Sequence, residues 1–163
     1  MIWEHLDKKL IKLHQEASSP GEVFEKLGEC FIEEGYTKED YVDALKEREA
    51  QFPTGLDING FGVAIPHTDA MYVLRETEGI MTLKEPVRFT QMGSDDTPVD
   101  VKVVFMLAIE NPQTHIKKLQ QILRIIQDDK VLEKVYLAET QDDVINIIKQ
   151  KEIEIGGETL WKQ

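Results

Sequence analysis

The segment from Val101 to Ile109 constrains the fold more than any other part of the chain. It is almost continuously apolar and rich in β-branched and aromatic residues. A run of this kind predicts a strand that is buried on both faces, because a strand with one solvated face alternates apolar and polar side chains. We therefore expect this strand to cross the middle of a sheet that is covered by helices on both sides.

Helical and strand patterns alternate along the rest of the sequence. Ser19 is followed by Pro20 and Glu22, which together indicate a capped helix start, and Gly35 supplies its stop. A second helix is predicted from Lys38 to Gln51, with Thr37 as its cap. A third is predicted after Asn111-Pro112, where an apolar stripe repeats at helical spacing: Ile116, Leu119, Ile122, Leu123 and Ile126. Two more are predicted over Leu132–Leu137 and Val144–Ile148, the last capped by Thr140. Further strands are predicted at Lys8–His14, Phe61–Ile65, Gly79–Leu83 and Val87–Phe89, whereas 53–59 has a loop composition. The alternation predicts an α/β fold with helices on both faces of the sheet.

Size and charge limit the classes of function. A chain of 163 residues predicts one domain over residues 1–163. The formal net charge of -12 argues against nucleic-acid binding and against anionic membranes, and it favours a positively charged protein partner. The lone Cys30 cannot form an internal disulfide, and the sequence offers neither a signal peptide nor a continuous membrane span. We expect a cytoplasmic protein with no membrane insertion.

His67 stands out among the four histidines of the sequence. It follows the apolar strand that includes Ile65, and Pro66 restricts the backbone just before it. Such a position delivers an accessible ring to the edge of a sheet, where sites in α/β folds gather. His5 and His14 lie among charged residues near the N-terminus and read as solvated side chains.

Two further residues break the expected pattern. Arg48 occupies a position where the helix after Thr37 calls for an apolar side chain, and its guanidinium must find a carboxylate, water or an anionic ligand. His115 lies in the first turn of a helix, where exposed N–H groups favour an anion and disfavour the imidazolium. If Arg48 and His115 converge on His67, they form a site suited to phosphoryl transfer, which needs positioning and charge stabilisation and no protein-bound metal.

These residues resemble a known family. The run Gly62-Val63-Ala64-Ile65-Pro66-His67, preceded by Arg48-Glu49 and Phe52-Pro53-Thr54-Gly55-Leu56 and followed by Val101–Ile109 and His115, is similar to enzyme IIA domains of the fructose/mannitol class of the bacterial sugar phosphotransferase system. The similarity extends from about Ser19 to Lys151, and galactitol-type proteins resemble the chain most. The resemblance implies a mixed parallel and antiparallel central sheet.

The resemblance also implies residue roles and partners. His67 would accept a phosphoryl group from the phosphocarrier protein HPr and pass it to a cysteine of a IIB component. Arg48 and His115 would stabilise that group, and no cofactor or metal would be required. By the same resemblance, the attacking atom would be Nε2 of His67, and a backbone carbonyl or a carboxylate would hold the other ring nitrogen.

Two other readings remain open at the level of sequence. His67, Asp69 and His115 have the ligand types of a two-histidine, one-carboxylate iron site, although such enzymes are usually built on double-sheet β folds. The same fold could instead act as a regulatory module whose phosphorylation state controls a partner.

Overall fold

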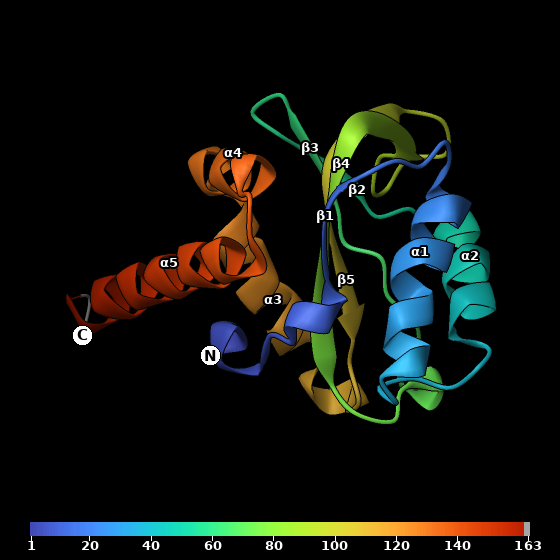
Figure 1. The fold of residues 1–163 in the computed structure, drawn as a ribbon, viewed down its shortest axis with the longest axis horizontal. Helices are drawn as coiled ribbons and strands as arrows, with labels where there is room; N and C mark the ends of the chain where they lie inside the picture. The colour runs from blue at the N-terminus through green and yellow to red at the C-terminus, as the bar shows by residue number, and fades with distance from the viewer. Residues whose placement is uncertain (162–163) are drawn as a thin grey trace.

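A computed structural model of the chain describes residues 1–161 and the side chains of residues 1–157. The elements are, in chain order, η1 (Ile2–His5), η2 (Lys8–Leu10), β1 (Ile11–Gln15), α1 (Pro20–Glu33), α2 (Tyr41–Gln51), β2 (Gly55–Ile58), β3 (Phe61–Ala64), η3 (Ala70–Tyr72), β4 (Thr77–Thr90), β5 (Pro98–Ala108), η4 (Pro112–Thr114), α3 (His115–Ile126), α4 (Asp129–Leu137) and α5 (Gln141–Trp161). The helices α1 and α2 cover one face of the sheet, and α3, α4 and α5 lie on the other (Figure 1). Within the part of the chain described here, no helix is long and apolar enough to cross a membrane.

The sheet mixes parallel and antiparallel pairs. Its strand order is β1-β4-β5-β3-β2. The β1–β4 and β3–β5 pairs are parallel, whereas β4–β5 and β2–β3 are antiparallel. The predicted α/β class and the mixed sheet are confirmed, and β5 is the central strand, as its apolar sequence predicts.

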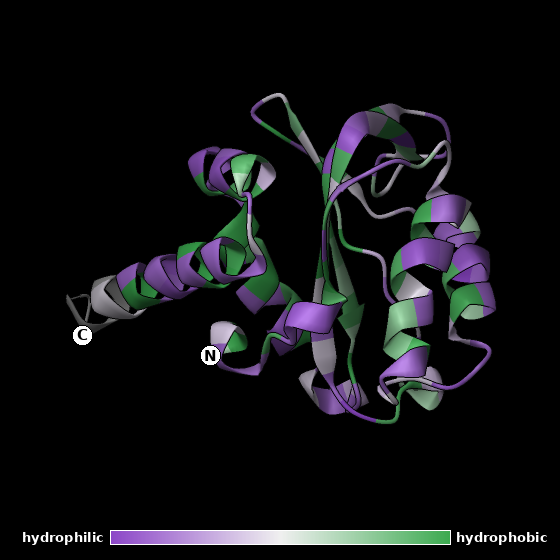
Figure 2. Cartoon of the chain, in the orientation of Figure 1, coloured by the Kyte–Doolittle hydropathy of each residue, from purple (hydrophilic) through white to green (hydrophobic). Residues whose placement is uncertain are grey.

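The side chains of β5 contribute to two separate hydrophobic cores, one on each face of the sheet. Val104, Met106 and Ala108 point into the core beneath α1 and α2. Val103, Phe105 and Leu107 alternate with them and join the core beneath α3, α4 and α5. This period of two is the strand geometry itself, and both faces are buried because both carry helices. Figure 2 shows the apolar sides of these helices turned toward the sheet.

Helix starts agree with the predicted caps at two of three places. The Ser19 side chain accepts the Glu22 amide at 3.2 Å, and the Thr140 hydroxyl accepts the Asp143 amide at 3.1 Å. The Glu22 carboxylate caps Ser18 instead of Ser19. The predicted start at Lys38 with Thr37 as cap is wrong: α2 begins at Tyr41, because Thr37 is buried in a β-bridge to Val73.

Strand boundaries differ more from the sequence prediction. The predicted loop over 53–59 contains β2, which is stabilised by its pairing with β3 and has little apolar pattern of its own. The predicted strands Gly79–Leu83 and Val87–Phe89 are halves of β4, which continues through Pro86 with an irregular register between Thr82 and Val87. The predicted strand at Lys8–His14 begins only at Ile11. These differences have one cause, since strand length depends on partners that are distant in sequence.

The apolar stripe predicted for α3 is only partly buried. Ile122 and Ile126 are buried, and Ile125 joins them. Ile116, near the beginning of α3, is 69% exposed, and Leu123, near its end, is 36% exposed, so two apolar side chains remain on the outer side of the helix.

Candidate functional site

His67 lies just beyond β3, where the chain continues alongside the central strand. The amide of Leu107 donates to the carbonyl of Pro66 at 3.0 Å, and His67 itself forms a parallel bridge with Leu107. Nδ1 of the imidazole lies 2.8 Å from the carbonyl oxygen of Ile65. Because a carbonyl only accepts hydrogen bonds, Nδ1 carries the ring proton and Nε2 keeps its lone pair. The backbone therefore sets both the orientation and the tautomer of the ring.

The His67 ring is more covered than the sequence predicts, since the residue is only 7% exposed. Burial lowers its pKa from 6.5 to about 4, and the charges of Arg48 and His115 act in the same direction. The hydrogen bond to Ile65 and the carboxylate of Asp69 oppose this shift without cancelling it. Some fully buried side-chain nitrogen and oxygen atoms of the described residues lack a hydrogen-bond partner, but Nε2 of His67 is not one of them. His67 is consequently a neutral imidazole at pH 7 with a lone pair available for attack.

His115 lies at the same site and comes from α3, one of the helices on the face of the sheet opposite α1 and α2. It is the first residue of α3, and the 3-10 turn before it is capped by Asn111, whose side chain accepts the Gln113 amide at 2.8 Å. The rings of His115 and His67 meet edge to face, with their centroids 5.1 Å apart. Burial lowers the pKa of His115, and the positive charge of Arg48 adds to this effect. A neutral His115 can donate one ring N–H to an anion beside His67.

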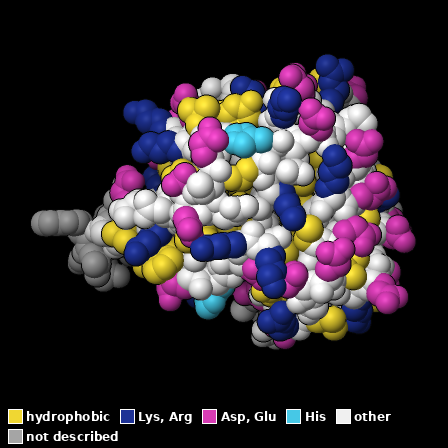
Figure 3. Space-filling model, in the orientation of Figure 1, with side chains coloured by type: hydrophobic (Ala, Val, Ile, Leu, Met, Phe, Trp, Pro, Cys, Tyr) yellow, Lys and Arg dark blue, Asp and Glu magenta, His cyan; other side chains and the backbone are white. Residues whose placement is uncertain are grey.

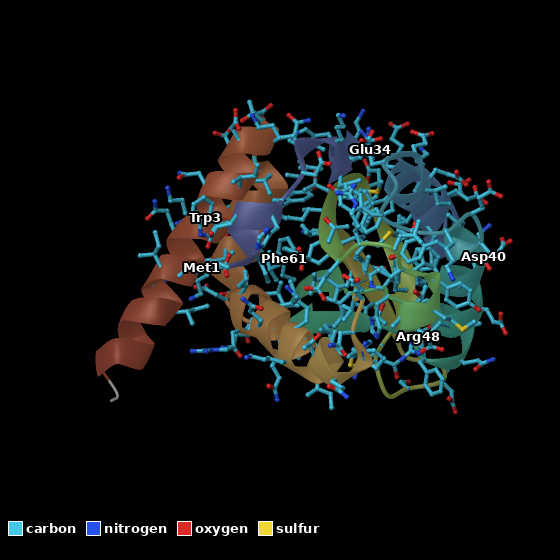
Figure 4. The ribbon with its side chains drawn as sticks, turned by 90° about the horizontal axis from the view of Figure 1, so that it is seen from below. Met1, Trp3, Glu34, Asp40, Arg48 and Phe61 are labelled. Carbon is cyan, nitrogen blue, oxygen red and sulfur yellow. The ribbon has the colours of Figure 1, made fainter. Side chains whose placement is uncertain are left out.

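Arg48 comes from α2, on the face of the sheet opposite α3. Nη1 of its guanidinium donates to the carboxylate of Asp69 at 2.9 Å, and the group stacks over the ring of Phe52 at 5.4 Å from the centroid. Its Nε is buried without a hydrogen-bond partner. Figure 4 views the molecule from this end and labels Arg48. The ion pair with Asp69, two residues after His67, places the guanidinium beside the two histidine rings, and its charge lowers the pKa of both histidines.

Two hydrogen-bonded anchors hold α2 in place. The buried hydroxyl of Tyr41, two turns before Arg48, donates to the carbonyl of Leu107 at 2.9 Å. The carboxylate of Glu49 accepts the amide of Thr54 at 2.9 Å and also its hydroxyl. Burial raises the pKa of Glu49, and these bonds partly offset the shift. Leu107 thus links the helix that carries Arg48 to the strand extension that carries His67.

The structure brings together the three residues selected from the sequence and adds a fourth. The rings of His67 and His115 are in contact, and Arg48 lies beside them through its ion pair with Asp69, which is the convergence that a phosphoryl-transfer site would require. The sequence interpretation missed the pairing of Asp69 with Arg48, although a carboxylate two residues after His67 is a visible signal. No group of three or more metal-ligating side chains occurs among the residues whose side chains are placed, so the iron-site alternative lacks its ligand cluster.

Comparisons with known proteins show similarity to one family. Residues 4–151 match the family model described as "Phosphoenolpyruvate-dependent sugar phosphotransferase system, EIIA 2". The galactitol-specific EIIA component of Escherichia coli K12 is 32% identical over 121 residues, which cover 74% of this chain and 80% of that protein. The mannitol-specific phosphotransferase enzyme IIA component of Bacillus subtilis is 32% identical over 148 residues, 89% of this chain and 96% of that protein. The solved complex of enzyme IIA mannitol and phosphorylated enzyme IIB mannitol from Escherichia coli includes a chain with a TM-score of 0.74 and 24% identity, covering 89% of this chain and 97% of that one.

Proposed function

Because this chain belongs to the EIIA 2 family of the phosphoenolpyruvate-dependent sugar phosphotransferase system, whose members relay phosphate through a histidine, we propose that His67 is that histidine. The observation that carries the assignment is the hydrogen bond between Nδ1 of His67 and the carbonyl of Ile65. It leaves Nε2 as the nucleophile and holds the ring in one orientation. No hydrogen bond of comparable kind fixes the ring of His115 among the side chains that the structure places.

The transfer step follows from these contacts. The lone pair of Nε2 attacks the phosphorus in line, and the donor keeps the electron pair of the bond that it loses. The ring of His67 gains positive charge as the N–P bond forms, and the Ile65 carbonyl stabilises that charge through Nδ1–H. Onward transfer reverses the roles: Nε2 keeps the electron pair of the N–P bond while the acceptor attacks.

Arg48 and His115 stabilise the transferred group from opposite sides. The guanidinium supplies a positive charge and several N–H donors, and the imidazole of His115 supplies one donor. Each charge-assisted hydrogen bond contributes about 1.5–3 kcal/mol. This assignment of Arg48 and His115 is supported by their convergence on His67 and by the edge-to-face contact of the two rings.

An apolar border around the site suits a protein donor and a protein acceptor. Phe52, Met71 and Ile116 follow Arg48, Asp69 and His115 closely in sequence, and they are 60%, 65% and 69% exposed. Exposed apolar side chains around polar groups are typical of protein interaction sites. We infer that the donor is the phosphocarrier HPr and the acceptor a cysteine of a IIB component.

The electrostatic surface adds to this inference. Figure 3 shows acidic side chains gathered on the side of the molecule covered by α1 and α2. The exposed acidic residues of these helices and the link between them are Glu25, Glu29, Glu33, Glu39, Asp40, Asp43 and Glu47. Such a surface attracts a basic partner and accelerates its association. Galactitol-type sugar transport is the inferred physiological setting, by similarity to the galactitol-specific relative.

Phosphorylation by purified HPr tests the assignment of His67. We expect acid-labile, base-stable phosphate on the wild-type protein, none on the His67→Ala variant, and retained labelling at a lower rate on the matched His115→Ala variant. Normal labelling of the His67→Ala variant would refute the assignment. Labelling of the wild type without transfer to any IIB component would favour the regulatory alternative.

A further inference from the structure

The guanidinium of Arg48 is already occupied by an anion in the unphosphorylated protein. Nη1 donates to Oδ1 of Asp69 at 2.9 Å, and the side chains of Arg48 and Asp69 are 29% and 71% exposed. Asp69 lies at the start of the η3 turn, but its carboxylate makes no capping hydrogen bond there. The only hydrogen bond found for this carboxylate in the described part of the chain is the one to Arg48.

The charge of Asp69 acts on both histidines as well as on Arg48. It raises the pKa of His67 and of His115, and Arg48 lowers both. The two effects have opposite signs at the same two rings, so the aspartate and the guanidinium form a local pair beside the place where the phosphoryl group would bind. A charge at that place interacts electrostatically with both Asp69 and Arg48.

We propose that Asp69 is a resting-state counter-ion that competes with the phosphoryl group for Arg48 and thereby weakens the binding of that group at His67. The proposal rests on the function assigned above. Asp69 acts through Arg48 and is a positioning residue: it does not touch the reacting nitrogen.

The competition follows from charge and geometry. A bound phosphoryl group carries a charge of about -1.5 to -2 at pH 7 and offers three acceptor oxygens. It must either displace the single Asp69 carboxylate from Nη1 or share the guanidinium with it at close range, and both alternatives cost free energy. Asp69 is largely solvated, so a displaced carboxylate can move into water without leaving a buried charge behind.

The consequence is a phosphohistidine that is held less tightly than Arg48 alone would hold it. A relay must release the group as readily as it accepts it, because a very stable intermediate would act as a sink. Asp69 would supply this balance. It would also keep free inorganic phosphate from occupying Arg48 in the resting protein.

The first test measures anion affinity and does not require a protein donor. Inorganic phosphate is titrated into wild-type protein and the variants Asp69→Asn and Asp69→Ala, and the ring signals of His67 and His115 are followed by NMR. Both variants should bind phosphate about two- to fivefold more tightly, the range expected for a partly exposed ion pair. The matched variant Asp95→Asn, which removes one exposed charge in the turn before β5, should bind phosphate as the wild type does.

The second test measures the equilibrium of the phosphoryl group between HPr and this protein. The ratio of phosphorylated to free protein should rise about two- to fivefold in Asp69→Asn, and Asp69→Glu should return it toward the wild-type ratio. Equal or lower values in both tests, for an Asp69→Asn variant whose His67 and His115 ring signals show a folded site, would overturn the proposal. A gain in affinity supports it, since a misfolded variant cannot mimic that gain. Wild-type protein that takes no phosphate from HPr would refute the proposed function and would leave the phosphate titration to decide the role of Asp69.

Discussion

A fall in pH from 7 to 5 should leave the His67 ring of the folded protein neutral. Burial lowers its pKa from 6.5 to about 4, so roughly one ring in ten carries a proton at pH 5. An ordinary histidine would be almost fully protonated there. His67 should therefore remain able to accept a phosphoryl group at a pH where an ordinary histidine has lost its lone pair.

The same shift links the stability of the protein to pH. Between pH 6.5 and about 4 the unfolded chain binds a proton at His67 and the folded chain does not, so the free energy of unfolding falls as the pH falls. One pH unit of pKa difference corresponds to about 1.36 kcal/mol, which gives about 3 kcal/mol in total, of which about 2 kcal/mol is lost by pH 5. At pH 7 both states are mostly neutral at this residue, and its contribution is fully present.

Two measurements check this reasoning. NMR titration of the His67 ring should give a midpoint near 4. Urea unfolding at pH 7 and pH 5 should show that wild type loses about 2 kcal/mol more than a His67→Gln variant, which has no proton to take up. The control His14→Asn, at an exposed residue with a φ of 52° that asparagine tolerates, keeps His67 and should therefore keep the loss that depends on His67. A His67 midpoint near 6.5, together with equal losses in wild type and His67→Gln, would refute the argument from burial.

Three further substitutions test the site and its support. Arg48→Lys keeps the charge but loses the planar fork, so the initial rate of labelling by HPr should fall about tenfold or more while thermal stability changes little; an unchanged rate would remove Arg48 from the mechanism. Tyr41→Phe leaves the Leu107 carbonyl without its donor, and urea unfolding should show a loss of about 1–2 kcal/mol. Gly62→Ala would place a Cβ 1.8 Å from the carbonyl oxygen of Asp100, where β3 meets β5. We expect a loss of about 3 kcal/mol or more, or insoluble protein, and a soluble variant of wild-type stability would contradict the close strand contact.

Positions fixed by local chemistry could be predicted from the sequence. The apolar run Val101–Ile109 requires burial on both faces wherever it lies, and β5 is the central strand. The order Ile65-Pro66-His67 places a histidine at a strand end by steric restriction alone. Arg48 can be identified because it breaks a helical pattern, and His115 because it lies in the first turn of a helix.

Features that depend on contacts distant in sequence could not be predicted in the same way. The strand β2 forms because β3 lies beside it, and β4 runs through Pro86 because β5 pairs with both of its halves. The helix α2 begins at Tyr41 and not at the predicted Lys38, because Thr37 forms a β-bridge with Val73. In each case the hydrogen bonds that decide the outcome come from another part of the chain.

The sequence by itself therefore determined which residues could do chemistry, because side-chain type and local backbone restriction are properties of neighbours along the chain. The tertiary structure decided what state those residues are in. Only the packing of two helical layers on one sheet lowers the pKa of His67 to about 4, brings His115 within 5.1 Å between ring centroids, and sets the Asp69 carboxylate on Arg48. Desolvation and charge pairing depend on distance in space, and that distance exists only after the chain has folded.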